Sequence, residues 1–371
     1  MMRPVLFAVL LLQPACSRCQ GGSSGPLAVT HDEPRLIVGF EGTPWKEDPV
    51  TLHAFEVLEK GFCTAGTYSD VIRRERAFPA VSVSGTVLYL ARGAYLERYE
   101  PLEPAAEPVI AELEDVPASL LCTGQTCLVG LESRVDHVDF GRRKPKVRTI
   151  HEEDLFPKPV DFLVRSDGLI VAVDDEVMPK YAFVLELSAS SRARYLYTTG
   201  LPSGPNETYM DAIAVDGTLV ITAQYGIMEG SGNTLYRWKI GRDPERSSRL
   251  KEFFPEDPTG MKTRLVAGEE NTLWNGLGAI DRHVFIGAGK RGILHMELGD
   301  EQALLHDVGG PVADLLVLSG RIIALVGQGG GERCGDGHAV ALVILTWNAK
   351  DGSFTEMGHH CHEAVLHRIA Y

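Results

Sequence analysis

A motif of strand, tight turn and strand recurs along this chain about every 40 to 50 residues. Each copy places a short apolar run before a turn and a second run rich in Val, Leu and Ile after it. The turns are marked by Gly85, Gly124, Gly168, Gly217, Arg282 and Gly320, at spacings of 39, 44, 49, 65 and 38 residues. A repeat of this period, built from strands, is typical of a β-propeller. The sequence therefore predicts an all-β ring of similar sheets.

The two ends of the chain complete one more unit. Residues 35–40 read as the second strand of a blade that lacks its first strand, and 52–58 and 62–68 supply the third and fourth. Residues 364–371 read as a first strand with no second strand after it. Pairing the C-terminal strand with the N-terminal blade would close the ring and remove its free edges. We expect seven blades over 35–371, with six or eight as open alternatives.

The N-terminal residues are of a different kind. Arg3 precedes an unbroken apolar run over 5–12, which is too short to span a bilayer and predicts a signal peptide at 1–15. Ala15 before Cys16 resembles the lipobox of bacterial lipoproteins, which implies acylation of Cys16. Ordinary cleaved export is the alternative. Residues 16–34 include a run of Gly and Ser typical of a flexible tether. We expect an extracytoplasmic protein of the periplasm or cell surface, anchored to the membrane by its N-terminal lipid.

Three segments carry a further resemblance. Residues 279–287, 292–298 and 312–320 resemble the LVIVD-type propeller repeat of exported bacterial proteins. The family's usual acidic residue after the third strand is absent, since Gly299 follows Leu298. Members of that group share no single chemistry, so the resemblance implies fold and compartment only.

The net charge restricts the partners. The chain carries 36 Lys and Arg against 50 Asp and Glu, a formal charge of −14 spread along its length. A field of this sign repels nucleic acid and anionic lipid. We expect no nucleic-acid partner and a monomeric protein.

The seven cysteines predict disulfides, because exported chains mature in an oxidising compartment. If Gly124 and Gln125 are the central residues of a turn, Cys122 and Cys127 face each other across it, at a spacing that suits a disulfide. Two separate buried thiols are the alternative. We expect Cys334, in a loop of the last complete repeat, to bond Cys361, in the connection to the closing strand. Zinc ligation by these cysteines with His338, His359, His360 and His362 stays open. Cys19 and Cys63 form the remaining candidate pair.

Polar residues recur where the first strand of several repeats begins, on the face of the ring that surrounds the channel mouth. They are Asp161, Asp211, Asn275, Asp314 and Glu363. Five such oxygen-bearing side chains would suit calcium, which takes six to eight oxygen ligands. The arrangement resembles the ring of propeller lactonases, which implies a metal that polarises a carbonyl or phosphoryl oxygen. The alternative is that these side chains cap backbone donors and face water.

The predicted function follows from these features. The sequence contains no nucleophile elbow, phosphate-binding glycine loop or zinc-protease helix motif. We therefore expect a binding or scaffolding module, with no required cofactor, that presents mouth-face loops to a protein, peptide or glycan. A calcium-dependent hydrolase at the channel mouth is the alternative. A spacing of 65 residues also predicts an insertion within 242–271, whose role is open.

Overall fold

A computed structural model gives the fold of the chain. It describes residues 34–42, 50–71, 78–103, 106–132, 134–151, 160–174, 180–187, 193–201, 207–227, 230–242, 248–253, 274–289, 292–300, 303–327, 333–334 and 338–371. The signal peptide, nearly all of the tether and most of the predicted insertion lie outside these residues. The described residues contain no helix long and apolar enough to cross a bilayer.

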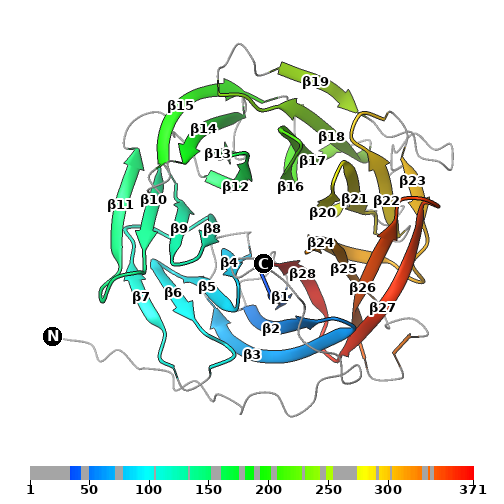
Figure 1. The fold of residues 1–371 in the computed structure, drawn as a ribbon, viewed down its shortest axis with the longest axis horizontal. Coiled ribbons are helices and arrows are strands. Elements are labelled where there is room, and N and C mark those ends of the chain that lie inside the picture. The colour runs from blue at the N-terminus through cyan, green and yellow to red at the C-terminus, as the bar shows by residue number, and fades with distance from the viewer. Residues whose placement is uncertain are drawn as a thin grey trace.

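Seven four-stranded antiparallel sheets form a closed ring, so the predicted seven-bladed β-propeller is confirmed (Figure 1). Blades 1 to 3 follow in chain order. Blade 1 contains β4 (Val81–Ser84), β5 (Val87–Arg92), β6 (Tyr95–Tyr99) and β7 (Val109–Glu112). Blade 2 contains β8 (Ser119–Thr123), β9 (Thr126–Gly130), β10 (Val135–Asp139) and β11 (Lys146–His151). Blade 3 contains β12 (Val160–Ser166), β13 (Leu169–Asp174), β14 (Tyr181–Leu187) and β15 (Ala193–Gly200).

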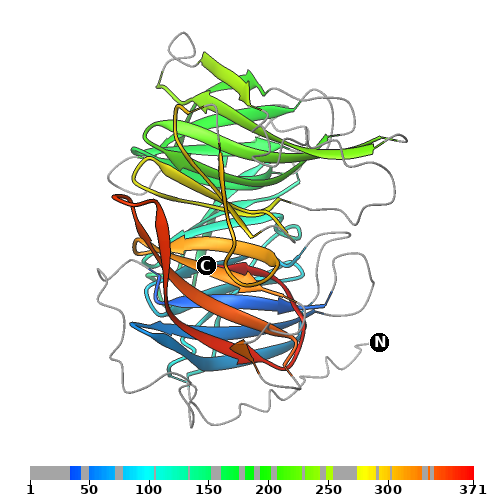
Figure 2. The ribbon, with the colours of Figure 1, turned by 90° about the vertical axis from the view of Figure 1, so that its right-hand side faces the viewer.

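Blades 4 to 6 repeat this pattern, and the first-named strand of each lies innermost. Blade 4 contains β16 (Glu207–Val215), β17 (Thr218–Ile227), β18 (Gly230–Lys239) and β19 (Ser248–Phe253). Blade 5 contains β20 (Asn275–Ile280), β21 (His283–Gly287), β22 (Ile293–Glu297) and β23 (Leu304–His306). Blade 6 contains β24 (Val312–Leu318), β25 (Arg321–Val326), β26 (Val340–Asn348) and β27 (Ser353–His362). Seen from the side, the blades surround a common axis (Figure 2).

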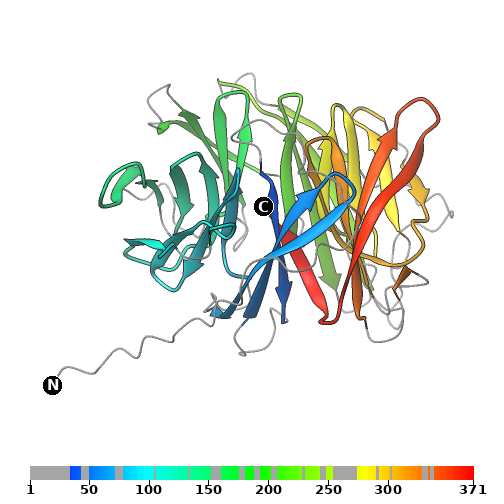
Figure 3. The same ribbon diagram turned by 60° about the horizontal axis from the view of Figure 1, so that its bottom comes forward.

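Blade 7 joins the two ends of the described chain. Its strands are β28 (Leu366–Ala370), β1 (Leu36–Glu41), β2 (Val50–Leu58) and β3 (Gly61–Val71). β28 pairs antiparallel with β1, so that Val38 lies opposite Ala370 and Glu41 lies opposite Leu366 (Figure 3). The predicted closure is confirmed. Because β28 covers the inner edge of β1, blade 7 has four strands like the other six blades.

Tight turns join the first two strands of each complete blade. Asp216 and Gly217 adopt φ values of 47° and 67°, and the corresponding residues in blades 3 and 6 also have positive φ. Turns with two such residues match the right-handed twist of the paired strands, which is why Asp-Gly recurs at these positions. The turn markers therefore reflect a real conformational requirement.

The core consists of one apolar layer for each of the seven junctions between neighbouring blades. Along β26, Leu342 and Ile344 pack toward blade 7, whereas Val343 and Leu345 pack toward blade 5. All four are almost fully buried. Successive side chains of a strand point to opposite faces, and both faces are covered here. This explains why the middle strands are continuous apolar runs rather than alternating ones.

Candidate functional site

Two acidic side chains occupy matching positions on innermost strands. In β16 a bulge leaves Met210 unpaired, and Asp211 follows it opposite Thr222. In β24 a bulge leaves Ala313 unpaired, and Asp314 follows it opposite Leu325. Bulges re-aim the side chains beside them, which places both carboxyl groups against the next blade.

A basic residue holds the same position in the closing strand. The register of β28 shifts at His367, so Arg368 follows that bulge and lies opposite Phe40. The innermost strands of blades 4, 6 and 7 thus contribute Asp211, Asp314 and Arg368. The sequence analysis missed Arg368, although a charged residue within an otherwise apolar closing strand was a usable signal.

The Asp314 carboxyl joins two blades. The Ile369 backbone N–H donates to Asp314 Oδ2 at 2.8 Å, and the Leu315 N–H donates to Oδ1 at 2.9 Å. Asp314 is only 4% exposed, and Ile369 belongs to the closing strand. A buried carboxylate that accepts two N–H groups satisfies two buried backbone donors. Asp314 therefore holds the first strand of blade 6 to the first strand of blade 7.

Asp211 makes the equivalent link between blades 4 and 5. Its Oδ1 accepts the Ala212 N–H at 2.8 Å, and its carboxyl also accepts a hydrogen bond from the backbone of Leu277 in β20. β20 itself lies close to Asp314. A Cβ added to Gly276 would lie 2.3 Å from Asp314 Oδ1 and 2.2 Å from the Leu315 nitrogen. Glycine is therefore required there for β20 and β24 to approach.

Burial is the main influence on the pKa values of Asp211 and Asp314. The pKa of Asp314 is raised to about 7, chiefly by burial and to a smaller extent by nearby Asp211, while Arg368 and the hydrogen bonds from the Ile369 and Leu315 backbone act in the opposite direction. Burial likewise raises the pKa of Asp211, and Arg368 again acts in the opposite direction. A buried carboxyl with a raised pKa holds a proton more readily than a surface one. The guanidinium limits the cost of ionising two carboxyls in one region.

The other predicted ligands stand in different positions. Asp161 is itself the extra residue of a bulge in β12, one place earlier than Asp211 and Asp314 in their strands. Glu363 is exposed and precedes β28. Asn275 pairs with Gly287 before the bulge in β20, and its side chain lies outside the described residues. Only Asp211 and Asp314 of the five are brought to one structural position. Calcium binding stays a prediction.

Across the described ranges, no group of three or more His, Cys, Asp or Glu side chains is arranged to hold a metal ion. Both Asp211 and Asp314 accept backbone N–H groups, as the capping alternative predicts, but Asp314 is buried and does not face water as that alternative also predicts.

Two predicted disulfides are confirmed. Cys122 and Cys127 are bonded across a hairpin whose last pair is Thr123 with Thr126, which places Gly124 and Gln125 in the turn. Cys334 is bonded to Cys361 with a Cα–Cα distance of 5.7 Å. Cys361 lies within β27 opposite Ala341, not in the connection to the closing strand. Because both sulfur atoms are in a disulfide, neither is available as the thiolate ligand of the zinc alternative.

Cys63 is also disulfide-bonded. Cys19 lies outside the described residues, so the predicted pairing of Cys19 with Cys63 stays a prediction. Cys16 also lies outside them, together with the predicted lipidation.

Two groups of histidines flank blade 6. At its junction with blade 5, the His283 Nδ1 and His295 Nε2 atoms are 3.0 Å apart, and the rings of His295 and Trp347 have centroids 4.1 Å apart. At its junction with blade 7, the rings of His53 and His362 have centroids 4.6 Å apart. Burial lowers the pKa of His295, His360 and His362 to about 4. These rings act as neutral packing groups near pH 7.

Comparisons with known proteins show the fold alone. No protein-family profile and no curated protein matches the sequence. A hypothetical selenium-binding protein from Sulfolobus tokodaii is similar in structure, with a TM-score of 0.57, 9% identity, and coverage of 91% of this chain and 93% of that one. The computationally designed Ika8 protein gives a TM-score of 0.52 at 12% identity, with 94% of each chain covered. Saccharomyces cerevisiae Sqt1 gives 0.50 at 10% identity, covering 90% of this chain and 87% of that chain.

Proposed function

We propose that this chain is a membrane-anchored binding or scaffolding module that acts outside the cytoplasm. Its partner is a protein, a peptide or a glycan. The proposal rests on the hydrogen bonds of two acidic side chains on the innermost strands. Asp211 and Asp314 accept backbone N–H groups that join neighbouring blades. Their arrangement supports a rigid ring, and a rigid scaffold that presents loops is a common basis for recognition.

The proposed compartment is supported by the cysteine chemistry and by the N-terminal sequence. Disulfides persist in oxidising compartments, and the structure contains Cys122–Cys127 and Cys334–Cys361. The signal-like residues 1–15 end immediately before Cys16, the proposed site of lipidation. LVIVD-type exported proteins, which the repeats resemble, are consistent with the same compartment.

The test uses the whole chain in a bacterial host that processes lipoproteins. Wild type and Cys16→Ala are expressed, and membrane and soluble fractions are compared after metabolic labelling with a palmitate analogue. We expect wild type to be labelled and membrane-bound, and Cys16→Ala to be unlabelled and released. Cross-linking in intact cells then identifies what wild type contacts. An unlabelled wild-type chain in the cytosol would overturn the proposal.

A calcium-dependent hydrolase is the second candidate. The observation that favours it is the pair of buried carboxyls with raised pKa values, because perturbed groups gather at functional sites. Against it, each carboxyl accepts backbone N–H groups. Calcium titration of the unfolding temperature separates the two candidates.

A further inference from the structure

One hairpin of this acidic protein is strongly basic. Five of the seven residues at 142–148 are basic, namely Arg142, Arg143, Lys144, Lys146 and Arg148. The chain as a whole has a formal charge of −14. The charge screening length is about 8 Å at physiological ionic strength, so a compact patch acts locally in spite of the opposite net charge.

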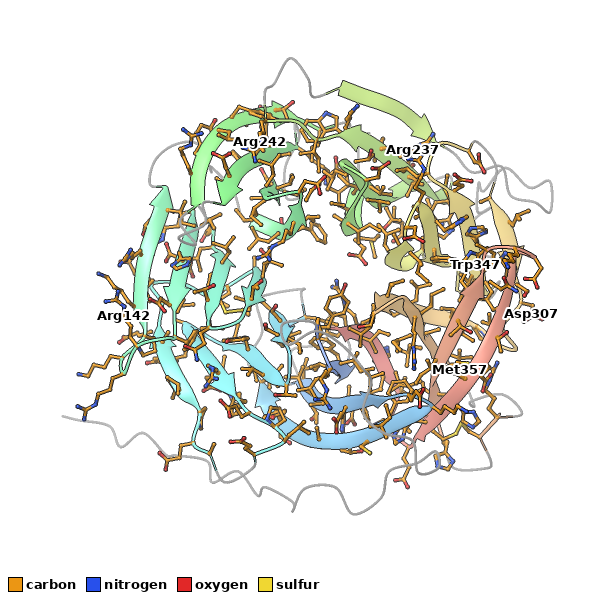
Figure 4. The ribbon with its side chains drawn as sticks, in the orientation of Figure 1. Arg142, Arg237, Arg242, Asp307, Trp347 and Met357 are labelled. Atoms are coloured by element: carbon orange, nitrogen blue, oxygen red, sulfur yellow. A yellow bond between two sulfur atoms is a disulfide. The ribbon has the colours of Figure 1, made fainter. Side chains whose placement is uncertain are left out.

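These residues occupy the outer rim of blade 2. Arg142, Arg143 and Lys144 lie in the turn between β10 and β11, and β11 is the outermost strand of its sheet. Arg142 lies at the edge of the ring, with side chains beside it extending away from the blades (Figure 4). The five side chains are exposed. We call them the basic hairpin.

The basic hairpin is largely uncompensated. Arg142 Nε pairs with Asp139 Oδ2 at 3.2 Å. Within the part of the chain that the structure describes, the other four basic side chains have no ion pair. The charges therefore remain available to an external anionic group.

The strand geometry narrows the class of partner. Lys146 and Arg148 are two residues apart on β11, so their side chains share a face at a spacing of about 6.6 Å. Carboxylates at alternate positions of an extended polypeptide repeat at the same spacing. Within the described residues β11 pairs with β10 alone, so its outer edge also offers backbone donors and acceptors. A second polypeptide strand can pair with that edge, whereas a lipid surface or a polysaccharide cannot form the same ladder.

Charged residues on an edge strand also serve to keep other strands away. That role explains Lys146 and Arg148 against uncharged or basic strands. That role does not require the three further basic residues in the turn between β10 and β11. An acidic strand would be attracted by the same charges rather than repelled. Repulsion of other strands predicts no binding of an acidic peptide, whereas recognition predicts binding, so an experiment can distinguish the two roles.

We infer that the basic hairpin docks an extended acidic polypeptide segment, which adds to the outer edge of β11 and pairs its carboxylates with the exposed basic side chains. This inference deepens the proposed function by naming the surface and the partner chemistry. It rests on that proposal only for its biological setting, because the binding itself is measured on the purified chain.

The experiment measures fluorescence anisotropy of a labelled eight-residue peptide in which Glu and Thr alternate. A peptide in which Glu and Pro alternate carries the same charge but lacks half of the backbone donors. The test variant is Arg143→Gln/Lys146→Gln/Arg148→Gln. The matched control is Lys60→Gln/Lys239→Gln/Lys350→Gln, which removes the same charge from exposed positions elsewhere.

We expect wild type and the control variant to bind the Glu-Thr peptide alike, within about twofold. The hairpin variant should bind about tenfold more weakly, because exposed charge contacts contribute up to about 1 kcal/mol each. The Glu-Pro peptide should also bind about tenfold more weakly, and affinity should fall as salt is added. Circular dichroism of each variant verifies folding.

Four results would overturn the inference. Equal binding by the two variants would place the peptide elsewhere, and equal binding of the two peptides would indicate a general polyanion site. Binding to phosphatidylglycerol vesicles that depends on the hairpin, without peptide binding, would identify a membrane surface instead. Hairpin-dependent self-association in sedimentation, again without peptide binding, would identify a second copy of the chain. None of these outcomes bears on the membrane anchoring of Cys16, so the two proposals fail separately.

Discussion

The innermost strands and the outer rim of the ring treat charged residues in opposite ways. On the inner strands, Asp211 and Asp314 are held against neighbouring blades and accept backbone N–H groups. On the rim, Arg143, Lys146 and Arg148 are exposed and unpaired within the described residues. The inner carboxyls therefore link neighbouring blades, whereas the exposed basic side chains are the ones that we propose bind a partner. Acidic residues near a propeller channel do not by themselves indicate a catalytic centre.

The largest expected effect tests the inner half of this comparison. Asp314→Ala leaves the Ile369 and Leu315 N–H groups without their acceptor. Each unpaired buried donor costs about 1–3 kcal/mol, so the free energy of unfolding should fall by about 4 kcal/mol. Urea denaturation measures this value. Asp314→Asn keeps one acceptor oxygen and should lose about half as much. Equal losses in the two variants would contradict the hydrogen-bond explanation.

The two disulfides provide the next comparison. Cys334 and Cys361 are 27 residues apart in sequence, and Cys122 and Cys127 are five apart. Loop-closure entropy predicts that the longer link contributes about 3.5 kcal/mol and the shorter about 2 kcal/mol. Paired Cys→Ala variants, unfolded in urea without reductant, test this order. A larger loss from the shorter link would show that the two bonds do more than restrict the unfolded chain.

Because histidines are buried at the junctions of blade 6, we expect the folded protein to lose stability in acid. The folded-state pKa of His295 is lowered to about 4, below its usual value of about 6.5. The unfolded chain therefore binds more protons between these values, and stability is lost as pH falls from about 6.5 through about 4. Replacing His295 by Phe should remove about 3 kcal/mol of this pH dependence. Thermal unfolding of both proteins from pH 7 to pH 4 provides the test, and parallel curves would refute it.

Asp314 should act with the opposite sign. Its folded-state pKa is raised to about 7, so the folded chain binds the extra proton between about 4 and 7. Its contribution is full below about pH 4 and is lost as pH rises through about 7. Asp314→Asn should therefore become more stable relative to wild type between pH 5 and pH 8. A constant difference across that range would indicate an ordinary carboxyl pKa.

The smallest expected effect concerns exposed ion pairs between blades. Arg282 of blade 5 pairs with Asp216 of blade 4, and both side chains are at least half exposed. Such pairs contribute about 0–1 kcal/mol. Arg282→Gln should therefore change the free energy of unfolding by less than about 1 kcal/mol in urea. A larger loss would mean that exposed charges also hold the ring together, which would weaken the contrast between buried and exposed charged residues.

The blade count and the closure were readable from the sequence because both follow local chemistry. Turns that need positive φ recur at Gly168, Gly217 and Gly320, and the final strand has an apolar pattern that needs a partner. The hairpin register of Cys122 and Cys127 followed from the same turn chemistry.

The inner site was only partly predictable, because it depends on bulges and on contacts between distant repeats. Asp211 and Asp314 both lie six residues before their turn glycines, whereas Asp161 lies seven before its own. Because of that single-residue difference, Asp161 is the extra residue of its bulge, whereas Asp211 and Asp314 follow theirs. From the sequence alone the three positions were expected to match. The position of His295 is set by packing between blades, which no local pattern records. Arg368 was marked in the sequence only by its charge within the closing strand.

We propose that the inner carboxyls join blades rather than form a calcium centre. The most direct measurement is the unfolding temperature of chelator-treated protein with and without calcium, for wild type and Asp314→Asn. We expect no change in the unfolding temperature of either protein when calcium is added. A rise in the unfolding temperature of wild type that is absent from Asp314→Asn would contradict it and restore the hydrolase candidate.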